Sequence, residues 1–283
     1  MAASIRNLQK ILGGPMLEEK LSLEGKTIVI TGGGTGLGRE MTLAMASAGA
    51  DLVIASRRIG PIDEVAQAAR DMGRRAITVS TDVTDASQVA ALMERALDEY
   101  GKVDVLLNNA GIVRGKGAEA IWDISDEDWR IGIDTNMSSA FFCSRAIAKH
   151  MVERGQGKII NVSSGFGYRG GRDNYMYAVG KGGIVQLTRT LATSLSRHGI
   201  TSTCIVPGFL PTTGTDESNI TLPRGDFIPI GRVGRPSELG AVAVFLASPG
   251  SDYMNGEAFA IDGGGLAGGV APTGYAPEIP LEI

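Results

Sequence analysis

Short runs of β-branched and other apolar residues alternate along the chain with longer segments whose apolar positions recur at helical spacing. A short apolar run is typical of a strand buried on both faces, and recurrence at three and four residues is typical of an amphipathic helix. The strand pattern occurs at 26–30, 51–56, 76–81, 103–107, 158–163, 201–206 and 258–262. The helical pattern occurs at 37–48, 61–72, 85–99, 126–154, 174–197 and 236–247. This alternation implies right-handed crossovers, so we expect one α/β domain with a doubly wound parallel sheet of about seven strands.

Three segments fall outside this alternation. Residues 1–22 are expected to form an N-terminal extension that docks on the protein or is disordered. Residues 208–232 have three prolines and no clean period, and a loop of this length in a compact domain is usually functional, so we interpret it as a substrate lid. The glycine- and proline-rich residues 265–283 predict a C-terminal tail. The domain itself is then expected to span 23–264.

Composition narrows the classes of function. The 283 residues carry a formal net charge of −4, with 43% hydrophobic and 20% charged residues, and no basic run that would attract nucleic acid. No apolar stretch approaches the roughly 18 residues of a membrane helix, and the first residues lack the apolar core of a signal peptide. Cys143 and Cys204 have no CxxC spacing and are expected to be buried free thiols in a reducing compartment. We therefore expect a cytoplasmic protein, and with only two histidines a metal site is poorly supplied.

The sequence TGGGTGLG, residues 31–38, follows the first expected strand directly and opens the first expected helix. Glycine allows a tight turn and close approach of a ligand, and a helix N-terminus offers free N–H groups and a partial positive charge. The glycines concerned are Gly32, Gly36 and Gly38, at a spacing that differs slightly from G-x-G-x-x-G. A turn that only packs well is the alternative, but the placement favours a site for the pyrophosphate of a dinucleotide.

The end of the second expected strand bears on which dinucleotide is bound. A carboxylate at this position would bind the ribose 2′-hydroxyl of NAD. This chain has Ser56 there, followed by Arg57 and Arg58. A hydroxyl and a guanidinium bind a 2′-phosphate through charge-assisted hydrogen bonds, whereas a carboxylate would repel it. We therefore expect NADP(H) in preference to NAD(H); two solvated arginines at a strand end are the competing interpretation.

The sequence NYMYAVGK, residues 174–181, contains two tyrosines and one lysine. Tyr175 and Tyr177 would lie on different faces of a helix, and only Tyr177 has a lysine four residues later, Lys181. Positions i and i+4 share a helix face, so an ammonium at Lys181, together with the positive charge of an oxidised nicotinamide, would favour the phenolate and lower the pKa of Tyr177. From these residues alone, an ordinary Tyr and Lys stacked on a helix is the competing interpretation.

Six motifs, taken in order, resemble the short-chain dehydrogenases/reductases. They are TGGGTGLG (31–38), NNAG (108–111), NVSSG (161–165), YAVGK (177–181), PGFLPT (207–212) and NGEAFAIDGG (255–264). Each motif is weak alone, but the ordered set agrees from about Leu23 to Gly264 and is specific. The resemblance implies a Rossmann-type sheet and oxidoreductase activity with a nicotinamide cofactor.

The resemblance also implies a catalytic set. Tyr177 would be the general acid/base, and Lys181 would support both the tyrosine and the nicotinamide ribose. Ser164, which lies 13 residues before Tyr177, would hold the substrate oxygen. Ser163 is its competitor, but successive strand residues point to opposite faces and the family spacing selects Ser164. Asn136 would hold a water that links the lysine to solvent, or would satisfy the backbone of a bent helix, and these two roles can coexist.

Further residues would surround the cofactor. Asp82 and Val83 resemble the pair that contacts adenine, Thr212 matches the residue that holds the nicotinamide carboxamide, and Asn108 would stabilise the sheet and border the cofactor. No metal is required. The implied cofactor set is Gly32, Thr35, Gly36, Leu37, Gly38, Ser56, Arg57, Arg58, Asp82, Val83, Asn109, Ala110, Gly111, Tyr177, Lys181, Pro207, Gly208 and Thr212.

Charged residues are expected near the substrate, in 112–119, 165–174 and 208–232. They would suit an anionic or polyhydroxylated substrate, or form a solvated rim. They are Arg114, Lys116, Arg169, Arg172 and Arg224, with the acids Asp173, Asp216, Glu217 and Asp226.

We therefore predict an NADP(H)-dependent enzyme that interconverts a ketone and a secondary alcohol of small size. The substrates of gluconate 5-dehydrogenases and of 3-oxoacyl reductases are the first ones to test. TGGGTGLG and VIASR also resemble 2,4-dienoyl-CoA reductases, although the Tyr-x-x-x-Lys and serine arrangement favours carbonyl chemistry. A sensor or scaffold that binds NADP(H) without catalysis is the alternative from another class, and the intact catalytic set speaks against it. Since the family forms dimers and tetramers, a homotetramer is expected, with a dimer as the alternative.

Overall fold

A parallel sheet of seven strands forms the centre of the molecule, in the order β3-β2-β1-β4-β5-β6-β7. The computed structural model describes residues 17–112, 120–172, 174–212 and 224–268. The strands are β1 (Thr27–Thr31), β2 (Asp51–Ser56), β3 (Ala76–Ser80), β4 (Val105–Asn108), β5 (Gly157–Val162), β6 (Ile200–Pro207) and β7 (Ala258–Ile261). The expected fold class, strand number and parallel pairing are therefore confirmed.

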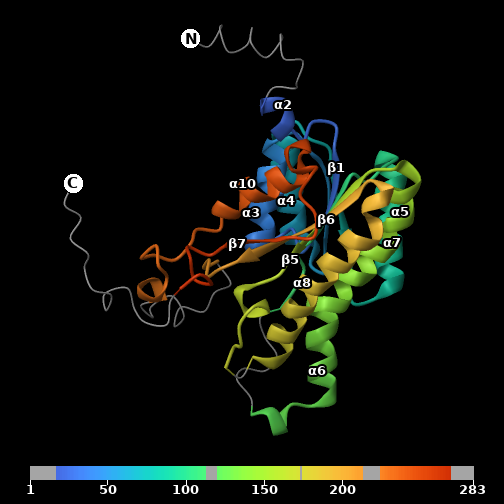
Figure 1. The fold of residues 1–283 in the computed structure, drawn as a ribbon. Helices are drawn as coiled ribbons and strands as arrows, with labels where there is room; N and C mark the ends of the chain where they lie inside the picture. Colours follow the sequence, from blue (N-terminus) through green and yellow to red (C-terminus); the bar gives the residue numbers. More distant parts are fainter. Residues whose placement is uncertain (1–16, 113–119, 173, 213–223, 269–283) are drawn as a thin grey trace, which may run out of the picture.

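Helices cover both faces of the sheet, as Figure 1 shows. The longer ones are α3 (Gly36–Ser47), α4 (Ile59–Asp71), α5 (Ala86–Tyr100), α6 (Asp126–Ile133), α7 (Ser139–Arg154), α8 (Tyr175–Leu195) and α10 (Glu238–Ala247). Alternate residues of a strand point to opposite faces, so Ile28 and Ile30 pack against α3, α4 and α10, while Val29 packs with α5 and α7. The sheet is buried on both faces, which explains why its strands are continuous apolar runs and not alternating ones.

The sheet order reverses beside β1, and this reversal creates the ligand crevice. β1 pairs with β2 on one side and β4 on the other, so the chain leaves the carboxyl ends of β1 and β4 in opposite directions. The loops after these strands are joined by Asn109, whose backbone N–H donates to Thr31 Oγ1 (3.1 Å) and whose side-chain amide donates to the Gly32 carbonyl (3.0 Å). The crevice therefore has a rigid floor at its centre.

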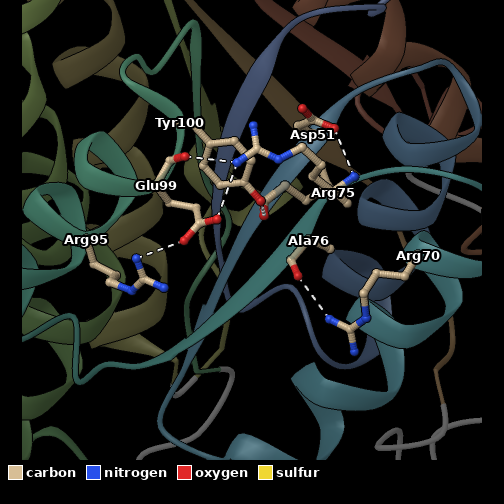
Figure 2. A network of polar contacts seen from close by, with 8 residues as sticks. Asp51, Arg70, Arg75, Ala76, Arg95, Glu99 and Tyr100 are labelled. Atoms are coloured by element: carbon tan, nitrogen blue, oxygen red, sulfur yellow. Dashed lines mark hydrogen bonds and ion pairs between the residues drawn. The ribbon is translucent and has the colours of Figure 1, made fainter.

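At the amino ends of β2 and β3, on the side of the sheet away from the crevice, a polar network joins the two strands to α5 (Figure 2). The Arg75 backbone N–H donates to Asp51 Oδ1 (2.9 Å), and its guanidinium donates to the Glu99 carbonyl (2.9 Å) and lies 4.3 Å from the Tyr100 ring centroid. The Tyr100 hydroxyl donates to the Leu52 carbonyl (3.1 Å). Burial raises the pKa of Tyr100 to about 12, so this hydroxyl stays protonated and keeps donating. The network fastens the end of α5 to two strands and fixes the edge away from the crevice.

The main departure from the expected elements lies in the predicted helix 126–154. It is divided by a π turn, Asp134–Ser138, between α6 and α7. The sequence analysis allowed a bent helix at Asn136 but did not predict a π turn there. The other expected elements occur with boundaries shifted by a few residues, which is the usual uncertainty of helix and strand ends.

The segments outside the alternation are described only in part. A short helix, α2 (Leu17–Leu21), lies in the expected N-terminal extension, while residues 1–16 are outside the described residues. In the expected lid, a 3-10 turn (η5) spans Arg224–Phe227, and 213–223 are outside the described residues, as are 269–283 of the expected tail. Within the described residues, no helix is long and apolar enough to cross a membrane. Cys143 and Cys204 are buried free thiols, as expected.

Candidate active site

A cavity of about 850 Å³ follows the carboxyl edge of the sheet from β3 to β6. Eighteen sequence-predicted residues that line it come from the ends of six strands, β1 to β6, and the loops after them, from α3 and from α8. They are Gly32, Thr35, Leu37, Gly38, Ser56, Arg57, Arg58, Asp82, Val83, Asn109, Ala110, Gly111, Ser164, Tyr177, Lys181, Pro207, Gly208 and Thr212. Of the predicted set only Gly36 and Asn136 do not line it, and Tyr175 is also outside it.

The glycine loop after β1 needs glycine for two separate reasons. Gly32 (φ +67°) and Gly36 (φ +54°) adopt the left-handed region, where a side chain would be strained. At Gly38, in the first turn of α3, a Cβ would collide with the Gly32 carbonyl and the Asn109 amide. Gly36 lies against Thr212, since a Cβ there would be 3.4 Å from Thr212 Cγ2. The loop therefore presents backbone and the N-terminus of α3 to the cavity, which suits an anionic group.

At the end of β2 the cavity is lined by a hydroxyl and two arginines. Ser56 Oγ accepts from the Arg58 backbone N–H at 3.4 Å, and Ser80 Oγ donates to the Arg57 carbonyl at 3.3 Å. Both arginine side chains are exposed, and neither has an ion-pair partner in the described part of the chain. An acidic side chain at the end of β2 would repel a 2′-phosphate. This chain has a neutral hydroxyl there, beside two cations.

The loop after β3 forms the outer wall. Asp82 Oδ1 accepts from the Thr84 backbone N–H (2.9 Å) and from Thr84 Oγ1 (2.7 Å). These bonds to Thr84, and the nearby Arg57 charge, lower the pKa of Asp82. Its carboxylate therefore fixes the shape of its own loop and stays ionised.

The inner end of the cavity holds the predicted catalytic side chains. Ser164 follows β5, and its hydroxyl lies near the Tyr177 phenol on α8 and acts to lower the pKa of that phenol. Ser164 Oγ accepts from the Phe166 backbone N–H at 3.3 Å. Lys181, one turn further along α8, is 4% exposed; its Nζ donates to the Val162 carbonyl at 2.8 Å and lies 5.8 Å from the Tyr177 ring centroid. Phenol, hydroxyl and ammonium are thus held within one small volume.

A lowered pKa of Tyr177 is predicted where Lys181 acts together with the positive charge of an oxidised nicotinamide, and it stays a prediction for that complex. In the protein itself, burial raises the pKa of Tyr177, and the nearby Ser164 hydroxyl only partly offsets this rise. Burial also lowers the pKa of Lys181 to about 8, with the nearby Cys204 acting in the opposite sense. The Lys181 ammonium donates to the Val162 carbonyl. A protonated phenol suits a proton donor.

Ser163 and Ser164 have different partners, as the strand alternation requires. Ser163 Oγ donates to the Lys181 backbone carbonyl at 2.7 Å and is buried, while Ser164 Oγ is turned to the phenol. Lys181 is therefore held at two points, through its side chain at Val162, the last residue of β5, and through its backbone at Ser163. The sequence pattern did not predict this second bond.

Asn136 lies in the π turn, behind the cavity wall, and is 2% exposed. Its amide donates to the Gly132 carbonyl (3.0 Å) and accepts from the Ile112 backbone N–H (3.0 Å). Gly111 separates it from Lys181, since a Cβ at Gly111 would be 3.0 Å from Asn136 Oδ1 and 3.2 Å from Lys181 Nζ. Asn136 thus satisfies backbone groups at a break in the helix, one of its two expected roles.

Asn108 stabilises the sheet as expected but does not line the cavity. Its side-chain amide donates to Asn161 Oδ1 at 2.9 Å, which links β4 to β5, and to Ser144 Oγ at 3.2 Å. Asn108 therefore does not border the expected cofactor cavity, and its neighbour Asn109 lines the cavity instead.

Several lining residues had no signal in the sequence. Phe166, whose ring lies 6.2 Å from that of Tyr177, and Asn174 flank the phenol. The others are Ala55, Thr81, Thr84, Ile112, Thr135, Val162, Ser163, Phe209 and Leu210. Their positions still offered a partial signal, because most lie at or just after strand ends or in the segments 165–174 and 208–232 expected near the substrate, whereas Thr135 lies in the π turn.

The charged residues expected around the substrate do not line the cavity where they are described. Arg169 lies over the outer side of Phe166, 5.7 Å from its ring centroid, and Arg172 and Asp226 are exposed. They belong to the rim, because nothing compensates the desolvation of a charge deeper in the cavity. Arg224 begins the 3-10 turn η5. Arg114, Lys116, Asp173, Asp216 and Glu217 lie outside the described residues.

Comparison with known proteins agrees with this geometry. Residues 26–222 match the short chain dehydrogenase family. The chain is 39% identical over 257 residues to 2-dehydro-3-deoxy-D-gluconate 5-dehydrogenase of Escherichia coli K12, covering 89% of this chain and 100% of that protein. It is 34% identical to 3-oxoacyl-[acyl-carrier-protein] reductase of a Synechocystis strain, over 86% of this chain and 98% of that one.

A solved structure shows the same fold. The gluconate 5-dehydrogenase from Burkholderia cenocepacia J2315, in complex with NADP and tartrate, is 31% identical and superposes with a TM-score of 0.81, covering 89% of this chain and 100% of that one. This chain therefore belongs to the short-chain dehydrogenase/reductase family. It is an oxidoreductase of the class that acts on CH–OH groups.

Proposed function

We propose that this protein is an NADP(H)-dependent oxidoreductase that interconverts a ketone and a secondary alcohol, with Tyr177 as the general acid/base. The observation that carries the proposal is that one cavity joins the glycine loop and Arg57 to Ser164 and Tyr177, with Lys181 beside them. A protein that only bound phosphate would need the first part of this cavity and not the second.

The residues fit a dinucleotide on steric and electrostatic grounds. A pyrophosphate would lie against the backbone of the glycine loop, where Gly38 leaves no room for a side chain. A 2′-phosphate would lie beside Ser56, Arg57 and Arg58, which carry no acid. When bound, NADPH would supply the hydride.

The chain's own residues would hold the substrate and move the proton. Ser164 and Tyr177 would both bind the carbonyl oxygen, and Tyr177 would transfer its phenolic proton to that oxygen as negative charge develops there. Because burial raises the pKa of Tyr177, the phenol is protonated at neutral pH and ready to donate. In alcohol oxidation the deprotonated oxygen of Tyr177 would accept the proton of the substrate hydroxyl. Lys181 would bind the ribose, and Asn136 would support proton exchange with solvent.

Sugar acids are the substrates we propose first, for example a 5-keto derivative of gluconate or of its 3-deoxy analogue. The support is the higher identity to 2-dehydro-3-deoxy-D-gluconate 5-dehydrogenases, at 36–39%, than to 3-oxoacyl reductases, at 33–35%. We further propose a homotetramer, with a dimer as the alternative, in the cytoplasm; measurement of molar mass in solution tests the assembly.

The test is the loss of NADPH absorbance with a panel that contains a keto sugar acid, a 3-oxoacyl thioester and a simple ketone. We expect turnover with at least one of them and slower turnover when NADH replaces NADPH. Tight binding of NADPH without turnover of any carbonyl would instead support the sensor alternative.

A further inference from the structure

Asn174 occupies the N-cap of α8 but does not act as a cap. An N-cap asparagine normally accepts a hydrogen bond from a backbone N–H two or three residues later. The side chain of Asn174 makes no such bond, and no other hydrogen bond reaches its amide from any residue that the structure describes. By contrast, Ser125 at the start of α6 caps in the usual way, with Oγ accepting from the Asp128 N–H at 3.0 Å.

Asn174 instead lines the cavity beside the catalytic phenol. It lies three residues before Tyr177, a spacing that places Cβ atoms about 5–6 Å apart on one side of a helix. Packing holds it there: a Cβ at Gly171 would be 3.3 Å from Asn174 Cβ and 2.9 Å from the Phe166 ring. Gly171 thus allows the loop to close tightly behind both Asn174 and Phe166.

An amide in this position is matched to one kind of ligand group. It offers both a donor and an acceptor without net charge, so it can bind a hydroxyl whichever way the hydroxyl proton points. A polar side chain that loses water when a ligand enters destabilises the complex unless the ligand supplies a partner. A methylene beside the reacting carbonyl would leave Asn174 unpaired, whereas a hydroxyl there would satisfy it.

We infer that Asn174 is a specificity-determining residue that binds a hydroxyl on a carbon next to the reacting carbonyl. The substrate class is therefore an α-hydroxy ketone, or in the reverse direction a vicinal diol, of the kind found in polyhydroxylated acids. A 3-oxoacyl thioester, with methylene groups on both sides of its keto carbon, is disfavoured. This inference rests on the proposed function and names its substrate class.

The test compares kcat/KM for an α-hydroxy ketone with kcat/KM for the matched ketone that lacks the hydroxyl. Asn174→Leu keeps the branching and the number of heavy atoms and removes both polar atoms, and Asn174→Ala is the second variant, which adds no bulk. In either, we expect the preference for the hydroxylated ketone to narrow roughly tenfold, the value of a lost neutral hydrogen bond, with the deoxy ketone little affected. The melting temperature should stay unchanged because no cap bond is lost.

Two further measurements separate specificity from folding and from catalysis. Ser125→Ala, which does remove a cap, should lower the melting temperature and leave the substrate preference intact. Tartrate and succinate differ only in two hydroxyls, so NADP-loaded wild type should bind tartrate more tightly and Asn174→Leu should lose that difference. Equal losses of kcat/KM with both ketones in the Asn174 variants, or an unchanged preference for the hydroxylated ketone, would overturn the inference. If the wild type reduces no carbonyl, the proposed function fails, while the tartrate comparison still decides the role of Asn174.

Discussion

At the scale of single residues, Tyr177 is one of two tyrosines that could have been the proton donor. Tyr177 lines the cavity together with Ser164, whereas Tyr175 does not line it. Tyr177→Phe keeps the ring and removes the transferable proton, so we expect turnover to fall by about 10²–10⁴. NADPH affinity, measured by fluorescence titration, should survive.

The matched control for this change is Tyr175→Phe, which removes the same atom two residues away. It should retain near-normal turnover. If Tyr177→Phe stays as active as that control, Tyr177 is not the general acid/base.

Ser163 is predicted to position Lys181. Ser163→Ala removes the bond from Oγ to the Lys181 carbonyl (2.7 Å) and should destabilise the fold by about 1 kcal/mol. Because that bond sets where α8 lies against β5, we also expect a several-fold loss in kcat with a shifted pH profile, and KM for NADPH should rise less. Steady-state kinetics across pH measures both effects.

Ser202→Ala is the control for Ser163→Ala, since Ser202 is a buried serine of the adjacent strand whose Oγ has no hydrogen-bond partner among the described residues. It should leave the pH profile unchanged and cost little stability. A Ser163→Ala variant that behaves like Ser202→Ala would show that the Ser163 bond has no positioning role.

Lys181 should make stability depend on alkaline pH. Burial lowers its pKa from 10.5 to about 8, so between these two values the unfolded chain binds more protons than the folded one. Stability therefore rises with pH across that window, and below it the buried charge is a constant cost of a few kcal/mol, at about 1.4 kcal/mol per unit of pKa.

Lys181→Met removes this titration. The difference in unfolding free energy between the variant and the wild type, from denaturant titrations between pH 7 and 10, should favour the variant at the lower pH and diminish as pH rises. A difference independent of pH would contradict the lowered pKa of Lys181.

At the scale of elements, the glycine loop and α3 depend on close backbone contact. Gly38→Ala would force a Cβ against the Gly32 carbonyl and the Asn109 amide, and overpacking of this kind costs about 1–3 kcal/mol. The movement of α3 should also weaken NADPH binding. Gly60→Ala in α4 is the control, because a Cβ there meets nothing within 4 Å. Thermal unfolding should show a lower melting temperature, and cofactor titration a weaker NADPH affinity, for Gly38→Ala only.

The sequence predicted the strands and helices because burial on two faces imposes a local pattern, visible in runs such as 51–56. It also predicted where most of the cavity wall would come from, since ligands bind at the carboxyl ends of parallel strands. The π turn was not predictable, because Asn136 is held there by Ile112, which is distant in sequence. The same holds for the bond between Ser163 and Lys181, which are 18 residues apart in the sequence.

At the scale of the whole molecule, ligand binding and folding are linked, so the cofactor preference can be read from stability. A ligand that binds only the folded state stabilises it by about 2.7 kcal/mol at a concentration 100 times its Kd. For a chain of this size each kcal/mol raises the melting temperature by about 2–4 °C. We expect NADP to raise the melting temperature more than NAD at equal concentration, because Ser56, Arg57 and Arg58 line the cavity where a 2′-phosphate would lie.

Arg57→Glu should reverse this order. It replaces a cation by an anion at the end of β2, so the stabilisation by NADP should fall by about 1.5–3 kcal/mol, while that by NAD changes little. Arg197→Glu makes the same change in net charge on an exposed turn before β6, at the opposite edge of the sheet, and should leave both shifts unaltered. Equal responses of the two variants would mean that the NADP preference comes from overall charge, and a larger shift with NAD in the wild type would assign the cofactor to NAD. The comparison depends on the position of one guanidinium, because net charge and fold are the same in both variants.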